Sequence, residues 1–581
     1  MSGLCGWVGD ADRAVLDAML AAIDYRGDRT DIASAPGVAL GYRWWGGRPG
    51  KSPGIHQAGG HLVACAGTLA PPVPSPAAAL REMLAGGRGL DTLDGAFAAA
   101  WWDGDRAALT LIRDPFGVRS LYYVEHRGVL YFASELKQLL AIPDLPVRLQ
   151  PAAVHKYLTF SFVPGEDVPV QGVRRLLPGR IATWRSGRLQ ITPYFSLKES
   201  IDPALEDQGA AVAAIRGRAE EAVARRLNGE REVGLFLSGG IDSSAVAVWL
   251  RGAGVPVRAF SLDFGDRSVE KPQAQRVADH LALPLTFLPV GGADVAEILM
   301  DLIWKLDLPF GDPVTGPQYL LGRAAREAGL DAVFNGEGGD QLFGGWTSKP
   351  MVAAEIYAGL YADDTRDETY LRSYHRFYGR EDHLYTPEFR AQVGGPGQRR
   401  ALLKPYLESE AASSFLARIR LADISLKGCQ NILPRAERMS NAWGLDVRVP
   451  LFDRALAEMS FTVPPHLKLR GATEKYVLKL ALQRDLPPDI VWRRKFGMSV
   501  PITDWVLGPL TGAIEELLGP RALAARGLFQ DAYVGRLRRG QNEPHETRRR
   551  RIGERLWTLA MLEGWMRIFI DGRGKRPGAN A

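Results

Sequence analysis

The stretch that decides the fold is Leu237-Ser238-Gly239-Gly240-Ile241-Asp242-Ser243-Ser244. It follows an apolar run over residues 232–237 with strand character and precedes the apolar segment 245–250, which is typical of a helix. Two glycines let the backbone approach a phosphate closely, and the N-terminus of the helix offers free N–H groups. This order of strand, glycine-rich loop and helix predicts a nucleotide site that holds pyrophosphate, with the serine hydroxyls as further donors.

A second glycine-rich loop, Gly336-Glu337-Gly338-Gly339-Asp340, follows the strand-like run 332–335. Open parallel sheets bind ligands at the carboxyl ends of their strands, so we expect the two loops to converge. A carboxylate does not favour direct contact with phosphate, and Asp242 and Asp340 are therefore predicted to share one Mg²⁺. Glu337 would point into the site as a general base or as the group that orients an incoming amine. The alternative interpretation is that both segments are ordinary glycine turns whose acidic side chains are solvated and bind no metal.

The alternation of strands and helices continues along this half of the chain. The run 257–264, with Ser261 and Asp263 near its end, reads as another strand after a crossover helix. Such alternation predicts a parallel sheet with helices on both faces. We include Leu237, Ser261, Asp263 and Gly336 among the expected nucleotide-binding residues, because they lie at the ends of these strands.

The first half of the chain has a different pattern. Short strand-like runs separated by turns continue to about residue 197 and predict a layered β domain. A polar break then leads to residues 205–570, which we expect to form the α/β domain, with a helical insertion over about 350–425. The last residues, 571–581, are expected to form a flexible tail.

Composition excludes several classes of protein. The 581 residues are 46% hydrophobic and 24% charged, as in ordinary globular proteins, and the net charge is 72 − 66 = +6. The basic runs 548–551 and 573–576 are too short for nucleic-acid binding, which is not expected. Three cysteines without a C-x-x-C pair argue against zinc and disulfides, and no signal peptide or long apolar stretch is present. We therefore expect a cytoplasmic protein without membrane contact.

The two loops resemble two signatures of the asparagine synthetase family. Further segments similar to that family follow in the same order, at residues 431–440, 445–453, 474–478 and 494–501. The resemblance covers nearly the whole chain. It implies an N-terminal glutaminase-like domain of the N-terminal-nucleophile type over 1–197 and a C-terminal synthetase domain of the ATP-pyrophosphatase type.

The resemblance also implies a chemistry. In the family, ATP activates a carboxylate as its acyl-adenylate with release of pyrophosphate, and ammonia or an amine then attacks. By position, Asp242 and Asp340 would carry Mg²⁺, and Glu337 would be the catalytic glutamate. Lys495 corresponds to the family's lysine near the α-phosphate, where a cation stabilises the charge that develops in the transition state.

The glutaminase half departs from the family pattern. Family members open with Met-Cys-Gly, whose cysteine is the nucleophile, but here the second residue is Ser2, and Cys5 comes three places later. Trp44 stands where the glutamine-binding arginine is expected, although Arg43 could compensate, and the sequences that orient glutamine are replaced at 66–68 and 74–77. The segments 93–97, 113–117 and 132–137 stay family-like. We therefore expect a retained fold without glutaminase activity.

The favoured hypothesis is an ATP-dependent amide-forming ligase that takes a small-molecule or peptide carboxylate and ammonia or an amine. Its acceptor pocket would be built from residues 310–430. A cyclase of the lasso-peptide or β-lactam type is the first alternative. A glutamine-dependent asparagine synthetase and a catalytically silent scaffold are further alternatives, and a homodimer is possible in each case.

Overall fold

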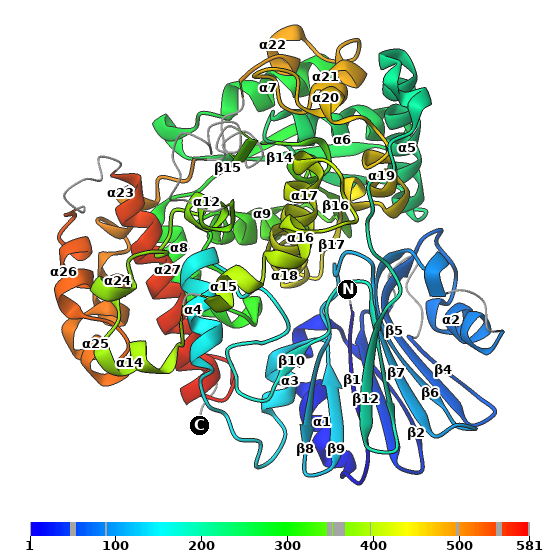
Figure 1. Cartoon of the computed structure of the whole chain (residues 1–581), viewed down its shortest axis with the longest axis vertical. Helices are drawn as coiled ribbons and strands as arrows, with labels where there is room; N and C mark the ends of the chain where they lie inside the picture. Colours follow the sequence, from blue (N-terminus) through cyan, green and yellow to red (C-terminus); the bar gives the residue numbers. More distant parts are fainter. Residues whose placement is uncertain are drawn as a thin grey trace.

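The computed structural model describes residues 2–46, 54–86, 90–345, 351–352, 366–395, 397–494, 499–541 and 549–578. Two stacked antiparallel sheets form the N-terminal part, drawn in blue to cyan in Figure 1, and a parallel sheet surrounded by helices forms the rest. This arrangement confirms the predicted fold class. Within the described residues no helix has the length and apolar character of a membrane span.

The two N-terminal sheets have six strands each, in the orders β10-β8-β9-β1-β3-β2 and β12-β11-β7-β6-β5-β4. The strands of the first sheet are β1 (Ser2–Val8), β2 (Arg29–Ala35), β3 (Val38–Trp44), β8 (Tyr122–His126), β9 (Val129–Ala133) and β10 (Arg174–Arg175). Those of the second are β4 (Ile55–Ala58), β5 (His61–Leu69), β6 (Gly95–Asp103), β7 (Ala108–Arg113), β11 (Arg180–Arg185) and β12 (Arg188–Pro193).

Side chains of β1 alternate between two cores. Leu4 and Val8 pack in the cluster between the two sheets, whereas Cys5 and Trp7 pack on the opposite face, where helix α1 lies. A period of two residues is what a strand covered on both faces requires. The helices of this part are α1 (Arg13–Ala21), α2 (Pro76–Ala85), α3 (Leu136–Leu140) and α4 (Pro151–Phe160), with the short turns η1 (Asp24–Arg26) and η2 (Leu90–Thr92).

The parallel sheet has the strand order β15-β14-β13-β16-β17. Its strands are β13 (Val233–Phe236), β14 (Val257–Asp263), β15 (Leu285–Pro289), β16 (Ala332–Phe334) and β17 (Asp446–Arg448). The chain leaves β13 toward β14 and β15, and then returns to add β16 on the other side of β13. The order of the strands therefore reverses between β13 and β16, and such a switch point is where ligands bind in this class of sheet.

Helices cover both faces of this sheet, and α7 and α9 both pack on β14. The helices nearest the sheet are α5 (Gln208–Leu227), α6 (Ile241–Gly252), α7 (Lys271–Leu281), α8 (Gly292–Leu306), α9 (Thr315–Glu327), α10 (Gly339–Phe343), α18 (Leu433–Asn441), α19 (Arg454–Ser460), α20 (Pro465–Lys468), α21 (Tyr476–Leu482) and α22 (Pro488–Val491). The short turns between them are η3 (Pro203–Glu206), η4 (Gly265–Arg267) and η6 (Pro450–Phe452).

The outer helices form two further groups. The expected helical insertion holds α12 (Arg366–Ser373), α13 (Glu381–Leu384), α14 (Pro387–Gln392), α15 (Gly397–Ala401), α16 (Lys404–Leu407), α17 (Phe415–Ala422) and the π-helix η5 (Asp423–Ile432). The C-terminal group, orange to red at the left of Figure 1, holds α23 (Ile502–Val506), α24 (Thr511–Leu518), α25 (Pro520–Arg526), α26 (Asp531–Arg538), α27 (Arg550–Met566) and the π-helix η7 (Arg567–Asp571).

Buried ion pairs join the two parts of the molecule. Glu437 Oε1, in α18, lies 2.9 Å from Arg26 Nη1 and 2.9 Å from Arg119 Nη1. Both arginines belong to the N-terminal part. Glu135, also from that part, pairs with Arg438 Nη1 at 2.8 Å. These side chains are at most 5% exposed. Removing one partner of such a network leaves an uncompensated buried charge, so the junction is expected to be rigid.

Candidate nucleotide and active site

A cavity of about 480 Å³ opens at the switch point between β13 and β16. Both glycine-rich loops line it, as the sequence predicted, and so do segments from much later in the chain. Among the predicted site residues, those that line it are Leu237, Ser238, Gly240, Asp242, Ser243, Ser261, Gly336, Glu337 and Asp340.

The first loop is closed by its own serines. Ser243 Oγ donates to the Gly240 carbonyl oxygen at 3.1 Å and accepts from the Ser238 backbone N–H at 3.2 Å. Helix α6 begins directly after Gly240 and is buried along most of its length. The loop therefore presents its backbone and the N-terminus of α6 to the cavity, which is the arrangement that binds phosphate.

Gly239 is required for packing rather than for contact with a ligand. Its φ is +69°, and a Cβ atom there would lie 2.4 Å from the backbone nitrogen of Ala274 in α7. Gly336 is similarly close to the first loop, because a Cβ atom on it would lie 2.4 Å from the Ser243 nitrogen. Glycine at these two positions lets the loops pack directly against α7 and against each other.

Asp242 and Asp340 lie together, and a lysine joins them. Lys475 Nζ contacts Asp242 Oδ2 closely and lies 2.8 Å from Asp340 Oδ1. The Lys475 side chain is 1% exposed. Burial alone would lower its pKa, but the two carboxylates raise the pKa well above the ordinary value for lysine. This lysine is therefore a fixed positive charge in the deepest part of the site.

Lys475 also has an unusual backbone conformation. It precedes α21 with φ +54°, in the left-handed region that residues other than glycine seldom adopt. Backbone strain of this kind is concentrated at functional sites. We did not predict this residue from the sequence, although it lies in the family-like segment 474–478. The sequence offered one signal for it, because Lys475 is a charged residue directly before the apolar run that forms α21.

The carboxylate pair is chemically suited to Mg²⁺. Asp242 Oδ1 is buried and accepts no hydrogen bond from the residues that the structure describes. The backbone of Gly339 packs against this carboxylate, since a Cβ atom there would lie 2.0 Å from Oδ1. Two carboxylates at the mouth of a phosphate loop supply the oxygen ligands that Mg²⁺ prefers, usually together with substrate phosphates.

Glu337 lines the same cavity, and an arginine rather than a lysine lies beside its carboxylate. Arg435 Nη2 is 3.4 Å from Glu337 Oε1, and Arg435 Nη1 is 2.5 Å from Asp312 Oδ2. Burial raises the pKa of Asp312, but the positive charges of Arg435 and Arg376 lower it by a larger amount. The pKa of Asp312 therefore lies below its ordinary value. Arg435 therefore holds two carboxylates in fixed positions. Neither Arg435 nor Asp312 was predicted from the sequence.

The π-helix η5 contributes the wall beside Glu337. Lys427 and Asn431, one turn apart, both line the cavity, and Asn431 Oδ1 is buried without a hydrogen-bond partner among the described residues. π-Helical segments are rare and are frequent at functional sites. The predicted acceptor region, 310–430, thus supplies Asp312 and Lys427, and the wall extends beyond it to Asn431 and Arg435.

Three predicted residues, Gly239, Ser244 and Asp263, do not line the cavity, and a fourth lies outside the described residues. Gly239 packs on α7, and Ser244 is fully buried. Asp263 ends β14, but Lys271 Nζ at 2.5 Å and Ser268 Oγ at 2.8 Å hold its carboxylate, and the hydrogen bond from Lys271 lowers its pKa. Lys495 lies outside the described residues.

Two of the positions considered above in the N-terminal part are engaged with the protein itself. Arg43 Nε donates to the carbonyl oxygens of Gly27 at 2.9 Å and Asp24 at 3.2 Å, and Arg43 Nη1 lies 3.4 Å from Thr30 Oγ1. Cys5 is fully buried, and burial raises the pKa of its thiol far above the ordinary value. Since the thiolate is the nucleophilic form, Cys5 is an inert core residue.

Two family models match this sequence: asparagine synthase over residues 214–567 and a glutamine amidotransferase domain over residues 79–195. The chain belongs to the asparagine synthase family. This membership makes it a carbon–nitrogen ligase and confirms the resemblance and the enzyme class predicted from the sequence. The amidotransferase match begins after every position at which the glutaminase half departs from the family pattern.

Three other proteins are similar to this chain over most of their length. Asparagine synthetase [glutamine-hydrolyzing] 1 of Bacillus subtilis (strain 168) is 25% identical, with 83% of this chain and 78% of that protein covered. A putative asparagine synthetase of Mycobacterium tuberculosis (strain ATCC 25618 / H37Rv) is 28% identical with the same coverage. The amidase chyE of Penicillium rubens is 26% identical and covers 73% of this chain and 72% of its own.

Proposed function

We propose that this enzyme uses ATP to activate a carboxylate as an acyl-adenylate, releases pyrophosphate, and joins the acyl group to ammonia or an amine. The observation that carries the proposal is that Asp242, Lys475 and Asp340 meet beside the first glycine-rich loop, in the same cavity that Glu337 lines. Family membership supports the use of ATP.

The phosphate end would be formed by the loop around Ser238 and the N-terminus of α6. Mg²⁺, when bound, would neutralise phosphate charge, and Asp242 and Asp340 are the residues that would hold it. Lys475 offsets the charge of the two carboxylates and places a cation where negative charge develops on the leaving pyrophosphate. We propose the same general role for Lys495, on its sequence position alone.

The acceptor end would position the carboxylate and the amine. Arg435 fixes Glu337, whose carboxylate can accept a hydrogen bond or a proton from an attacking amine. Lys427 and Asn431 line the same wall and can bind polar groups of the acceptor. The acyl substrate itself, whether aspartate or a related or peptidyl acid, is left open by this arrangement.

Ammonia or an amine, rather than glutamine, is the proposed nitrogen source. The buried thiol of Cys5 supports this choice, as does the hydrogen bonding of Arg43 Nε to backbone oxygens of the protein. A cyclase that forms an intramolecular amide differs only in carrying its amine on the same substrate. The names of the bacterial relatives favour a glutamine-dependent asparagine synthetase as the second candidate. We also keep the domain limits 1–197 and 205–570, a cytoplasmic location and a possible homodimer as proposals.

The direct test is ATP–pyrophosphate exchange with a panel of carboxylates in the presence and absence of Mg²⁺. We expect exchange with a specific carboxylate, and we expect Asp242→Asn and Asp340→Asn each to abolish it in a protein that still folds, with a lower unfolding temperature because the buried Lys475 loses one of its two carboxylate partners. Full exchange in both variants would contradict the proposed metal site. No exchange with any carboxylate, in a well-folded enzyme that binds ATP, would contradict adenylation.

A further inference from the structure

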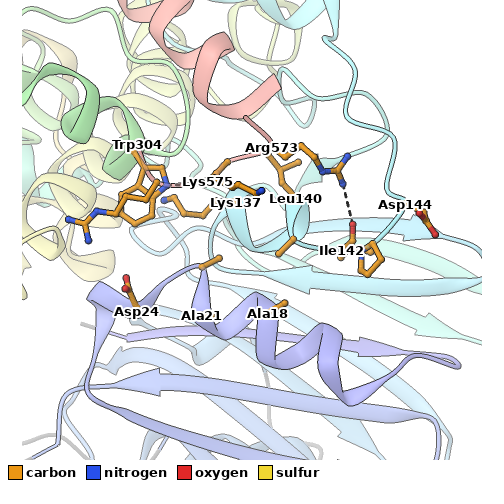
Figure 2. A pocket seen from close by; sticks show the side chains of 15 residues that line it. Ala18, Ala21, Asp24, Lys137, Leu140, Ile142, Asp144, Trp304, Arg573 and Lys575 are labelled. Carbon is orange, nitrogen blue, oxygen red and sulfur yellow. Dashed lines mark hydrogen bonds between the residues drawn. The ribbon is translucent and has the colours of Figure 1, made fainter. Parts of the chain in front are cut away.

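A second cavity, of about 650 Å³, lies between the N-terminal sheets and the end of the chain. It shares no lining residue with the cavity at the switch point. Figure 2 shows Ala18 and Ala21 of α1 on one side, and Trp304 of α8, Lys137 of α3 and the tail residue Lys575 on the other. The elements that enclose it therefore come from both parts of the molecule.

The tail that closes this cavity has a defined conformation over its described residues. Lys575 N–H donates to the Gly572 carbonyl oxygen at 3.1 Å, and Arg573 and Gly574 have φ values of +51° and +74°, which makes a tight turn. The indole N–H of Trp304 donates to the Gly574 carbonyl oxygen at 2.9 Å. The expected flexible tail is thus fixed to α8 at Gly574.

Arg573 is held on the other side of the turn. Its guanidinium donates to the carbonyl oxygens of Ile142 at 3.3 Å and Leu145 at 3.2 Å, and the bond to Ile142 is drawn in Figure 2. These acceptors are neutral, so they position the guanidinium without compensating its charge. The hydrogen bonds of the turn and of Arg573 therefore fix a cation at the wall of the cavity.

Positive charge at the cavity exceeds the negative charge available to balance it. Within the described residues, Arg573 and Lys575 form no ion pair, and Arg576 reaches only Asp301, at 3.6 Å. Of the two carboxylates that line the cavity, Asp144 already pairs with Arg127 at 3.1 Å, which leaves Asp24 alone against the cations of the tail. Lys137 is balanced by buried carboxylates, so the excess arises from the tail.

A buried amine lies next to Trp304 in the wall of the cavity. Lys305 of α8 is 5% exposed, and its Nζ lies 3.4 Å from the centroid of the Tyr25 ring and 5.1 Å from that of Trp304. It forms no ion pair within the described part of the chain. Burial lowers the pKa of Lys305 to about 7; Asp301 opposes the shift, and Lys137 and Arg576 add to it. An anion nearby would relieve this repulsion.

We propose that this cavity is a second ligand site, which binds a small phosphate-bearing anion. Concave sites with an excess of one charge attract ligands of the opposite charge, and the volume is in the range of small-molecule sites. The turn carries three cations, Arg573, Lys575 and Arg576, and such a cluster suits a ligand group with several charged oxygens. Arginine in particular binds phosphate through two parallel hydrogen bonds. Such a ligand would contact both parts of the molecule and would stabilise their junction.

The test is isothermal titration of the full-length enzyme with inorganic tripolyphosphate in Mg²⁺-free buffer. We expect binding that weakens at least tenfold in the double variant Arg573→Ala/Lys575→Ala. Ala21→Trp is expected to have the same effect, because Ala21 is exposed at the end of α1 and a large side chain there fills the cavity without changing its charge. Lys404→Ala, which removes an exposed lysine of α16, is the matched control.

The outcomes separate this site from the nucleotide site. Tripolyphosphate held only by the loop around Ser238 would bind equally well to all of these variants, and that result would overturn the proposal. Equal weakening in Lys404→Ala would show a general effect of net charge and would also overturn it. Citrate that binds as tightly as tripolyphosphate would refute the assignment to phosphate. Thermal unfolding of each variant shows whether the fold is retained.

Discussion

At the scale of single residues, the candidate active site is organised by two cations that each hold two carboxylates. Lys475 joins Asp242 to Asp340, and Arg435 joins Asp312 to Glu337. Carboxylates at such short distances repel one another unless a cation lies between them. Both pairs line the same cavity.

The first prediction concerns Lys475→Met, which removes the charge and keeps most of the volume. We expect ATP–pyrophosphate exchange to fall on the order of 100-fold, the effect of losing one stabilising group in the transition state. Without the amine, Asp242 and Asp340 repel each other, so the metal-free variant should unfold at a lower temperature and Mg²⁺ should raise that temperature more than in the wild type. Calorimetry with and without Mg²⁺ measures both effects.

Lys404→Met is the control for this prediction, because Lys404 is exposed in α16. It should change neither exchange nor the response to Mg²⁺. If Lys475→Met unfolds like the wild type and gives no additional response to Mg²⁺, the two carboxylates do not form a metal site.

At the scale of elements, the loops after β13 and β16 form the site because their backbones pack without side chains between them. Gly239 lies against α7, and Gly336 lies against the start of α6. The positions of Asp242 and Asp340 therefore depend on how closely these loops approach each other.

The second prediction compares two glycines that belong to adjoining elements. Gly239→Ala should destabilise the fold by more than about 1–2 kcal/mol, the cost of the left-handed conformation, because the new Cβ atom also meets backbone in α7. It should also weaken ATP binding. Gly252→Ala, in α6 with open space around it, should instead stabilise the fold by about 0.5–1 kcal/mol. Urea unfolding gives both values, and equal effects of the two substitutions would refute the packing argument.

The sequence predicted these elements well because their signals are local. A strand, a glycine pair and a helix start within fifteen residues identified the phosphate loop and Asp242. Lys475 reaches the same carboxylate from 233 residues away, and no local pattern marks that contact. Asp263 shows the opposite case, since its place at a strand end was predicted but Lys271 and Ser268 hold its carboxylate.

At the scale of the whole molecule, the two parts are joined by charges that are buried in the junction. Glu437 is the central acceptor, with Arg26 and Arg119 on either side. Burial raises the pKa of Glu437, but Arg26, Arg438 and Arg119 lower it, and the net result is a pKa of about 2. The carboxylate is therefore ionised at every physiological pH.

The third prediction follows from this depressed pKa. A carboxylate with a lower pKa in the folded state contributes stability above its unfolded pKa of about 4.5 and loses it as the pH falls toward about 2. Glu437→Gln should cost about 3–5 kcal/mol near pH 7, because three arginines lose a buried partner. The difference from the wild type should shrink between pH 4.5 and 2 in denaturant unfolding.

The pair of the partly buried Arg454 and Glu458, whose side chain is 49% exposed, supplies the comparison for Glu437. Glu458→Gln should change stability by less than about 1 kcal/mol at any pH, as surface pairs do. A similar small effect of Glu437→Gln would mean that the junction does not depend on its ion pairs.

The last prediction concerns how nitrogen reaches the synthetase part of the molecule. The N-terminal part keeps its sheets and its junction, but Trp44 stands where the glutamine-binding arginine is expected, the neighbouring Arg43 holds backbone oxygens through Nε, and the thiol of Cys5 is buried with a raised pKa. Glutamine would therefore not be held in attack geometry, and no reactive thiolate is available at Cys5. We expect product formation with ammonium or an amine, no glutaminase activity, and unchanged turnover in Ser2→Ala and Cys5→Ala. Glutamate released in step with pyrophosphate, and lost in Ser2→Ala, would instead establish a working glutaminase and a glutamine-dependent enzyme.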